Sequence, residues 1–406
     1  MAYDLPFLAR QFDTRGEPVE IAPVPVGHIN DTYLVTTVEN PGGPAAVARA
    51  SCPCTSDETG ASWLDKARPR WPCDARAGRP RHDATRYILQ RINQIVFTKP
   101  VQVMANVVRI TEHLRAKMAA ADPESAWRQL VVVAARDGGA YYQDAAGNVW
   151  RMYNFIENAV TYDSLQSAPL AREAARMFGW FQRMLIDLPG PPLHETILGF
   201  HNTPRRFERF QEVVQADVAN RAKNARAEID FVFENAALCH VLFDLVKRGD
   251  VPIRIAHNDA KINNVMFDTS TSQGVCVIDL DTVMPGLSVY DFGDLVRTAT
   301  CPAAEDERDL SKVAIDIALF EALARGFVEE TGQFFTPAEK RHLVFGGKLI
   351  TFEQMIRFLT DYLAGDVYYK VHREGHNLDR TRTQMKLVQS IIEQEQELNR
   401  LVERAL

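Results

Sequence analysis

The stretch that decides the fold runs from His257 to Asn264 and reads HNDAKINN. It places the carboxylate of Asp259, the ammonium of Lys261 and the carboxamide of Asn264 close together in the chain. Phosphoryl transfer needs a carboxylate beside the attacking hydroxyl, ligands for Mg²⁺ and positive charge near the transferred group. We therefore expect Asp259 to be the base, Lys261 to meet the γ-phosphate and Asn264 to bind the metal. His257 is expected to be a buried imidazole that orients the loop.

Two further acids, Asp279 and Asp281, end the apolar stretch that begins at Val275. Alternate residues of a strand point to the same side, which predicts that both carboxylates face one way. Two carboxylates side by side repel each other, and a divalent cation with oxygen ligands removes that repulsion. Asp279 and Asp281 are therefore predicted to bind Mg²⁺ together with Asn264. Taken alone, the same pair would fit a solvated turn equally well.

A third acidic motif, the DFG triplet at 291–293, has the letters of the magnesium motif of protein kinases. It lies 32 residues after Asp259, whereas Asp279 lies 20 residues after it. This position favours Asp279 as the metal ligand. Asp291 and Asp294 are expected to shape the substrate pocket or to anchor the helix that follows.

The first part of the chain is predicted to be a small sheet with one helix. Residues on either side of GHIND predict a hairpin over 18–39, and RYILQRINQIV predicts a strand over 86–96. An amphipathic helix is expected over 100–118, followed by two strands around a turn at Gly138. Residues 41–85 carry no sustained periodicity and are interpreted as an irregular insertion.

After Asn158 the pattern becomes helical, with apolar residues at three- and four-residue spacings. Helices are predicted over 169–188, 206–218 and 228–249, and a capping box at Thr336 begins a later one. Together with the first part, this pattern predicts an α+β fold.

The length of 406 residues favours two lobes over a single core. We expect a β-rich nucleotide-binding lobe over 1–157 and a larger, mostly helical catalytic lobe over 158–406. Lys and Arg number 46 against 53 Asp and Glu, and a net charge of −7 argues against a nucleic-acid binder. No apolar run approaches the length of a membrane span, and the N-terminal residues lack a secretion signal. The expected protein is cytoplasmic and acts on small molecules, with its six cysteines as free thiols.

Longer segments extend the pattern around HNDAKINN. The chain resembles the N-acetylhexosamine 1-kinases in several segments up to residue 388, among them GHINDTYLVTT, RYILQRIN, WRMYNFIENAVTYD and VIDLDTVMPG. These kinases belong to the aminoglycoside phosphotransferase and choline kinase-like superfamily. The resemblance implies a bilobal protein-kinase-like fold. It also implies that ATP, with Mg²⁺, phosphorylates the anomeric C1 hydroxyl of GlcNAc or GalNAc to give the sugar 1-phosphate.

The resemblance implies substrate-binding residues as well. Asp259 would take the proton of the anomeric hydroxyl. The sugar pocket would be lined by His28, Tyr290, Arg357 and Tyr368. From their spacing alone, the two tyrosines would also fit core aromatics, and Arg357 a surface position on a helix.

Nucleotide-binding residues leave less trace in the sequence. The segment that links the lobes of a kinase-like fold corresponds here to residues 153–157. Its backbone, at Asn154 and its neighbours, is expected to contact adenine, and Phe155 or Ile156 is expected to cover the ring. RYILQRIN offers Gln90 or Arg91 in place of the lysine of the third kinase strand, and both stay open. Glu112 is a candidate partner, although a solvated helix glutamate is the simpler interpretation.

Residues 41–85 depart from the family pattern, which runs almost directly from TYLVTT to RYILQRIN. Zinc ligands are offered by Cys52, Cys54, Cys73 and His82, but the C-x-C spacing is unlike that of ordinary zinc modules. A disordered insertion is the favoured interpretation, and translated non-coding sequence is a further alternative.

Two other functions stay open at this point. A kinase of another small alcohol, such as choline or an aminoglycoside, would keep the fold and change the acceptor. Cationic acceptors of this kind require an acid-rich, aromatic cleft. An inactive kinase-like scaffold would follow if the insertion disrupts the first lobe, although Asp259, Asn264 and Asp279 are all present.

Overall fold

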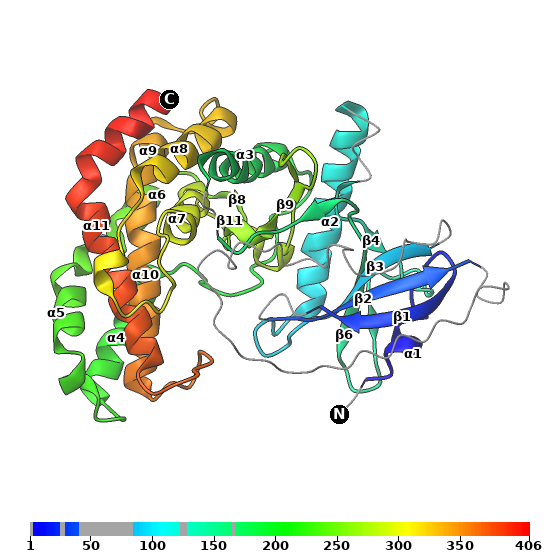
Figure 1. The fold of residues 1–406 in the computed structure, drawn as a ribbon, viewed down its shortest axis with the longest axis horizontal. Helices are drawn as coiled ribbons and strands as arrows, with labels where there is room; N and C mark the ends of the chain where they lie inside the picture. Colours follow the sequence, from blue (N-terminus) through cyan, green and yellow to red (C-terminus); the bar gives the residue numbers. More distant parts are fainter. Residues whose placement is uncertain (1–2, 25–28, 40–83, 122–127, 165–166) are drawn as a thin grey trace, which may run out of the picture. The chain divides into compact units, whose positions relative to one another are not determined.

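The computed structural model describes residues 3–24, 29–39, 84–121, 128–164 and 167–406. Its contacts divide the chain into two compact units (Figure 1). The first comprises Met1–Asp163 with Met266–Thr271, and the second comprises Ser164–Val265 with Ser272–Leu406. His28 and the four proposed zinc ligands lie outside the described residues.

The first unit is built on an antiparallel sheet in the order β1-β2-β3-β6-β4, with β5 paired to β6. Its strands are β1 (Glu17–Pro23), β2 (Asp31–Val38), β3 (Ala84–Arg91), β4 (Val132–Val133), β5 (Tyr142–Gln143) and β6 (Val149–Asn154). The predicted hairpin is confirmed, since β1 pairs with β2. β3 begins two residues before the predicted strand and ends at Arg91, so that Ile92 to Val96 lie outside it.

Apolar side chains on one side of this sheet form the core of the first unit. Leu89, Trp150 and Met152 are fully buried there, beside Phe12. The short helix α1 (Leu5–Ala9) adds Leu8 to the same cluster.

The predicted amphipathic helix is confirmed as α2 (Pro100–Ala121). Its buried residues Val103, Val107, Ile110 and Leu114 follow the helical period. At the end of this unit β7 (Ala159–Val160) pairs antiparallel with Phe267 and Asp268.

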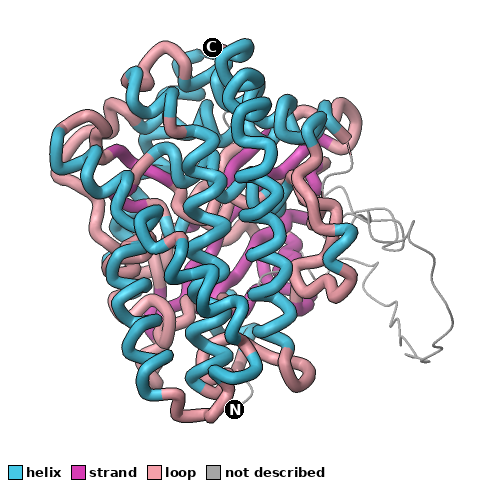
Figure 2. The backbone as a smooth tube through the Cα atoms, turned by 90° about the vertical axis from the view of Figure 1, so that its left-hand side faces the viewer, coloured by secondary structure: helices cyan, strands magenta, loops and turns pink. Residues whose placement is uncertain are grey.

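The second unit is mostly helical. Helices, drawn in cyan, dominate the view of the chain in Figure 2. The helices of this unit are α3 (Ala168–Leu185), α4 (Thr203–Ala216), α5 (Arg226–Glu234), α6 (Val241–Arg248), α7 (Ser288–Ala299), α8 (Ile317–Thr331), α9 (Pro337–Arg341), α10 (Leu343–Ala364) and α11 (His376–Ala405). α10 packs against α4, α7 and α11 and is buried along most of its length. The predicted α+β fold, with a small β-rich part and a larger helical part, is confirmed. Within the described residues no helix has both the length and the apolar surface required to cross a bilayer.

Two details of the helical prediction can be compared with the structure. The capping box is confirmed, because Thr336 and Glu339 exchange both of its hydrogen bonds at the start of α9. The single helix predicted over 228–249 is wrong, because it divides into α5, a 3₁₀ turn and α6. At the break the Asn235 side chain donates to the Phe231 carbonyl oxygen, a local bond that competes with helix continuation.

Short strands carry the HNDAKINN stretch. β8 (Arg254–Ala256) leads into it and pairs with β11 (Met284–Gly286). The prediction that Asp279 and Asp281 continue the preceding strand is wrong. That strand, β10 (Gly274–Val277), ends before them, and Asp279 has a left-handed backbone with φ of 61° at the start of a 3₁₀ turn. Strand alternation therefore cannot place these two side chains.

Candidate active site

Asp291, the aspartate of the DFG triplet on α7, binds the backbone at the start of the HNDAKINN stretch. Its carboxylate oxygens accept hydrogen bonds from the backbone N–H of His257 at 2.9 Å and of Asn258 at 2.8 Å. Gln182 on α3 donates to the same carboxylate at 2.6 Å. Asp291 was expected to shape the substrate pocket or to anchor the helix that follows; its fully buried carboxylate anchors the loop.

Asn258 fixes the next part of the loop. It has a left-handed φ of 62°, a conformation that asparagine tolerates better than most residues. Its side-chain nitrogen donates to the carbonyl oxygens of Ala256 (3.0 Å), Thr282 (3.1 Å) and Met284 (3.3 Å). A side chain at Gly286 would clash, because its Cβ would lie 2.4 Å from Asn258 Oδ1. These bonds of Asn258 connect the HNDAKINN loop to the turn that contains Thr282 and to β11.

His257 is fully buried, as expected for an orienting residue. Its Nε2 lies 3.0 Å from the carbonyl oxygen of Ile278, which can only accept, so Nε2 carries the proton. The rings of Phe178 and Phe181 pack against the imidazole. Its Nδ1 is buried and has no hydrogen-bond partner in the described part of the chain.

The carboxylate of Asp259 lies against the ammonium of Lys261, with 2.7 Å between Oδ2 and Nζ. Asn264 donates its side-chain N–H to the Asp259 carbonyl oxygen at 2.9 Å and to Oδ2 at 3.3 Å. Burial alone would raise the pKa of Asp259, but the neighbouring Lys261 lowers it below its ordinary value. The carboxylate is therefore ionised and can accept a proton.

Asp279 and Asp281 repel each other in the turn that follows β10. Burial and the neighbouring charge of Asp281 raise the pKa of Asp279 to about 6. An excess of buried carboxylate charge fits a site for a divalent cation with oxygen ligands. Since the Asn264 nitrogen is committed to Asp259, its Oδ1 is the atom left for such a cation. The residues present fit Mg²⁺, and their role as its ligands stays a prediction.

The residues expected to bind the acceptor differ in their surroundings. Arg357 on α10 donates to Gln354 at 2.9 Å and lies over the rings of Phe200 and Tyr369. No carboxylate forms an ion pair with it among the residues that the structure describes. Tyr290 is buried in α7.

Tyr368 lies in the loop after α10 and is 67% exposed. The edge of its ring contacts Tyr369, whose hydroxyl accepts a hydrogen bond from Gln354 at 3.2 Å. Tyr369 and Phe200 were not predicted, although Tyr369 adjoins a predicted residue in the same YY pair.

A buried polar network beside the loop was also missed by sequence reasoning. The ring nitrogens of His201 lie 2.9 Å from the Asn258 carbonyl oxygen and 2.9 Å from Glu353 Oε1 on α10. Thr203 donates to Glu353 Oε2 at 2.6 Å, and Arg206 lies 3.3 Å from Oε1. His201, Thr203 and Arg206 are close together in the chain, but Asn258 and Glu353 lie 57 and 152 positions from His201, so no local pattern links the three to the loop or to α10.

In the first unit, Gln90 and Arg91 both contact neighbouring strands. Gln90 accepts a hydrogen bond from Arg151 at 3.0 Å and donates to Thr32, while Arg91 forms an ion pair with Asp31 at 2.8 Å. Arg151 on β6 is only 1% exposed and was missed, although an arginine inside the apolar strand VWRMYN is a visible signal.

Glu112 is exposed on α2, as the simpler interpretation of it expects. Which residue takes the place of the kinase lysine stays open between Gln90 and Arg91, and the structure adds Arg151 as a third candidate.

The segment expected to contact adenine is partly committed to the sheet. The backbone N–H groups of Asn154 and Phe155 donate to the carbonyl oxygens of Val131 and Arg86. The Asn154 side chain also bonds to Val131 N at 2.7 Å. Ile156 is buried. If adenine binds here through the backbone, it would therefore contact carbonyl groups, or the N–H groups of residues after Phe155.

Residues 20–325 match the family model of the phosphotransferase enzyme family. The chain belongs to this family. A phosphotransferase moves a phosphoryl group to an acceptor, and the acid-rich turn and the ionised Asp259 of this one suit that chemistry.

Solved structures with a similar fold are distant from this phosphotransferase in sequence. An ethanolamine kinase of Plasmodium vivax is 12% identical, with 90% of this chain and 82% of that chain covered and a TM-score of 0.48. A putative aminoglycoside phosphotransferase of Ralstonia eutropha is 12% identical, with 95% and 96% covered and a TM-score of 0.49. A choline kinase of Cryptosporidium parvum is 12% identical, with 95% and 90% covered and a TM-score of 0.45.

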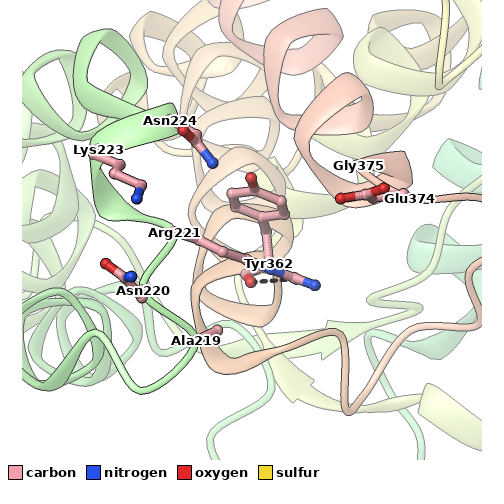
Figure 3. A pocket seen from close by; sticks show the side chains of 8 residues that line it. All are labelled: Ala219, Asn220, Arg221, Lys223, Asn224, Tyr362, Glu374 and Gly375. Atoms are coloured by element: carbon pink, nitrogen blue, oxygen red, sulfur yellow. Dashed lines mark hydrogen bonds between the residues drawn. The ribbon is translucent and has the colours of Figure 1, made fainter.

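Figure 3 shows a pocket of the phosphotransferase at the end of α10 that contains none of the residues above. It is lined by Ala219, Asn220, Arg221, Lys223, Asn224, Tyr362, Glu374 and Gly375. Arg221 donates to the Tyr362 carbonyl oxygen at 2.9 Å and forms an ion pair with Asp366 at 2.6 Å. These bonds tie the residues after α4 to the end of α10, which is a structural role.

Proposed function

We propose that this phosphotransferase uses ATP to phosphorylate the anomeric C1 hydroxyl of an N-acetylhexosamine, giving the sugar 1-phosphate. The proposal depends on the surroundings of Arg357. Its guanidinium lies over the rings of Phe200 and Tyr369 and donates to the carboxamide of Gln354. Such a group suits the hydroxyl and acetamido oxygens of a neutral sugar, and aromatic rings suit the apolar face of a sugar ring. The reaction is expected in the cytoplasm.

Asp259 has the properties that the proposed reaction requires of its base. The anomeric oxygen attacks the γ-phosphorus, its proton passes to the Asp259 carboxylate, and the bond to the bridging oxygen breaks to release ADP. An anomeric hydroxyl is more acidic than an ordinary alcohol, so a carboxylate of low pKa is an adequate base. Lys261 would then offer its charge to the transferred group. Bound Mg²⁺ would neutralise phosphate charge, held by Asn264 Oδ1, Asp279 and Asp281.

A cationic acceptor such as choline or an aminoglycoside is less well supported. Arg297 interacts electrostatically with both Asp259 and Arg357, so a second guanidinium group lies near Arg357, although Asp294 and Glu305 form ion pairs with Arg297 at 2.9 Å and 3.4 Å. Glu353 is neutralised by His201 and Arg206 and is not available to bind a cation. Aromatic cages for cations lack such positive charge.

The test is an acceptor panel with Mg-ATP and the full chain. N-acetylhexosamines, plain hexoses, choline and an aminoglycoside are incubated separately, and ³¹P-coupled NMR identifies the atom that bears the phosphate. We expect phosphate on C1 of an N-acetylhexosamine. Phosphate on C6, or transfer to choline or the aminoglycoside alone, would contradict the proposal. Absence of any transfer would favour the inactive scaffold.

A further inference from the structure

His201 stands between the catalytic loop and a buried carboxylate. Its side chain is 9% exposed and that of Glu353 is 2% exposed. The carbonyl oxygen of Asn258 can only accept, so Nε2 must carry a proton. Glu353 also accepts hydrogen bonds from Thr203 and faces Arg206, which favours its ionised form. An ionised carboxylate likewise only accepts, so Nδ1 is protonated too.

His201 is therefore a cation paired with an anion inside the second unit. Burial alone would raise the pKa of Glu353, but His201 and Arg206 lower it to about 2. Burial opposes the charge on His201, and Glu353 nevertheless raises its pKa above the ordinary value. A buried ion pair rarely adds net stability, because desolvation offsets the attraction between the charges. A role in fixing a geometry accounts for it better.

We propose that the His201–Glu353 pair is a positioning device for the base Asp259. The peptide group between Asn258 and Asp259 contains the carbonyl that His201 holds. On the other side of Asn258, Asp291 holds the backbone N–H. Asn258, with its left-handed backbone, is thereby fixed at both of its peptide groups. These contacts also fix the orientation of the next residue, Asp259, and therefore the direction of its side chain.

The pair also links the base to the acceptor side. Glu353 and Arg357 are four residues apart on α10, which places them on one face of that helix. The same helix face thus holds the loop through His201 and presents Arg357. This arrangement fixes the position of Asp259 relative to the bound acceptor. Turnover is most sensitive to small displacements between a catalytic group and its reactant. The inference rests on the proposed base role of Asp259.

Two substitutions of His201 separate its two contacts. His201→Gln places an amide nitrogen near the position of Nε2, so it keeps the bond to the Asn258 carbonyl. His201→Asn places its amide near Nδ1, so it keeps a bond to Glu353 and loses the one to Asn258. His240→Asn, at an exposed position, is the matched control.

We expect His201→Asn to lower kcat about 10- to 100-fold, with KM for ATP changed less than about threefold. His201→Gln should recover most of that loss. Melting temperatures of both variants are measured to confirm that each is folded. Equal losses of kcat in the two variants, or no loss in either, would overturn the proposal.

Amide hydrogen exchange gives a second readout that needs no acceptor. Peptides covering residues 256–264 should exchange faster in His201→Asn than in His201→Gln or the unmodified protein. Equal exchange in the two variants would overturn the positioning role. If the wild-type protein transfers no phosphate to the acceptor panel, the proposed function fails, and the exchange comparison still decides whether His201 positions the loop.

Discussion

Asp259 carries its charge beside Lys261, so removing the carboxylate removes both the base and the partner of that ammonium. Asp259→Asn keeps the shape of the side chain. We expect kcat to fall by about 10³-fold or more, because general-base catalysis typically contributes 10²–10⁴-fold. The dissociation constant for ATP, measured by calorimetry, should stay within about threefold. Asp244→Asn on α6, an exposed position, is the control, and full turnover in Asp259→Asn would exclude this residue as the base.

Arg357 is expected to act on acceptor binding more than on chemistry. Arg357→Gln keeps a hydrogen-bond donor and removes the charge. We expect KM for the acceptor to rise about tenfold and kcat to change less, because a charged hydrogen bond contributes about 1.5–3 kcal/mol. Initial rates over a range of acceptor concentrations give both constants. Arg205→Gln, exposed on α4, should leave both unchanged, and an unaltered KM in Arg357→Gln would remove Arg357 from the acceptor site.

The His201–Glu353 pair predicts a pH-dependent part of the stability. The depressed pKa of Glu353 contributes stability above its ordinary value of 4.5, which is lost as the pH falls toward about 2. The raised pKa of His201 contributes stability below its ordinary value of 6.5, which is lost as the pH rises through the folded value. The pair is therefore most stabilising between those two ordinary values.

Urea unfolding of the wild-type protein and His201→Gln tests this dependence. The difference in the free energy of unfolding should be largest near pH 5.5 and smaller near about pH 9. Other titrating groups are common to both proteins and cancel in the difference. A difference that does not vary with pH would show that His201 is neutral in the folded state.

At the residue scale, contacts within one loop could be predicted and contacts between distant residues could not. Asp259, Lys261 and Asn264 contact one another as their spacing suggests. The Asn258 carbonyl, by contrast, meets His201, which is 57 positions away. Glu353 is 152 positions from His201, and only the packing of α10 brings the two together.

The loop after α10 shows how one carboxylate shapes a whole segment. Asp361 accepts hydrogen bonds from the backbone N–H groups of Val367, Tyr368 and Tyr369, at 2.8–2.9 Å. Asn377 of α11 donates to the same carboxylate at 2.8 Å. This segment carries Tyr369, which lies beside Arg357, and Tyr368, which contacts Tyr369, so its shape bears on the proposed acceptor site.

Asp361→Asn should loosen this loop while the helices around it remain folded. The new amide group would oppose at least one of the three N–H groups, and an unsatisfied buried group costs about 1–3 kcal/mol. We expect a lower melting temperature and a higher KM for the acceptor, with KM for ATP unchanged. Thermal denaturation and acceptor kinetics check both effects. Unchanged acceptor kinetics would separate this loop from the site.

The periodicity of apolar residues predicted helices and strands well where their apolar faces are buried. α2 and the first strands follow their apolar patterns. The pattern failed where a local side-chain bond intervenes, as at Asn235, and where a strand stops, as at Val277. Both failures follow from interactions that hydropathy does not encode. The left-handed Asp279 belongs to the same group.

At the scale of the whole molecule, the register of β2 and β3 bears on residues 39–83. Val38, the last residue of β2, lies opposite Ala84, the first residue of β3. Two antiparallel strands whose ends are directly opposite can be joined by a two-residue turn of the Asn-Gly type. The sheet of the first unit therefore does not require the intervening chain in order to close.

Replacing residues 39–83 by Asn-Gly should leave both units folded. Closing a long loop costs more entropy than closing a short one, and the change of length gives a gain of at most about 2–3 kcal/mol in unfolding free energy. We expect an equal or higher melting temperature and unchanged kcat. A control chain carries residues 40–83 in scrambled order, and it should match the wild-type protein if their sequence has no role. Loss of turnover in a shortened chain that is folded would show instead that these residues serve the active site.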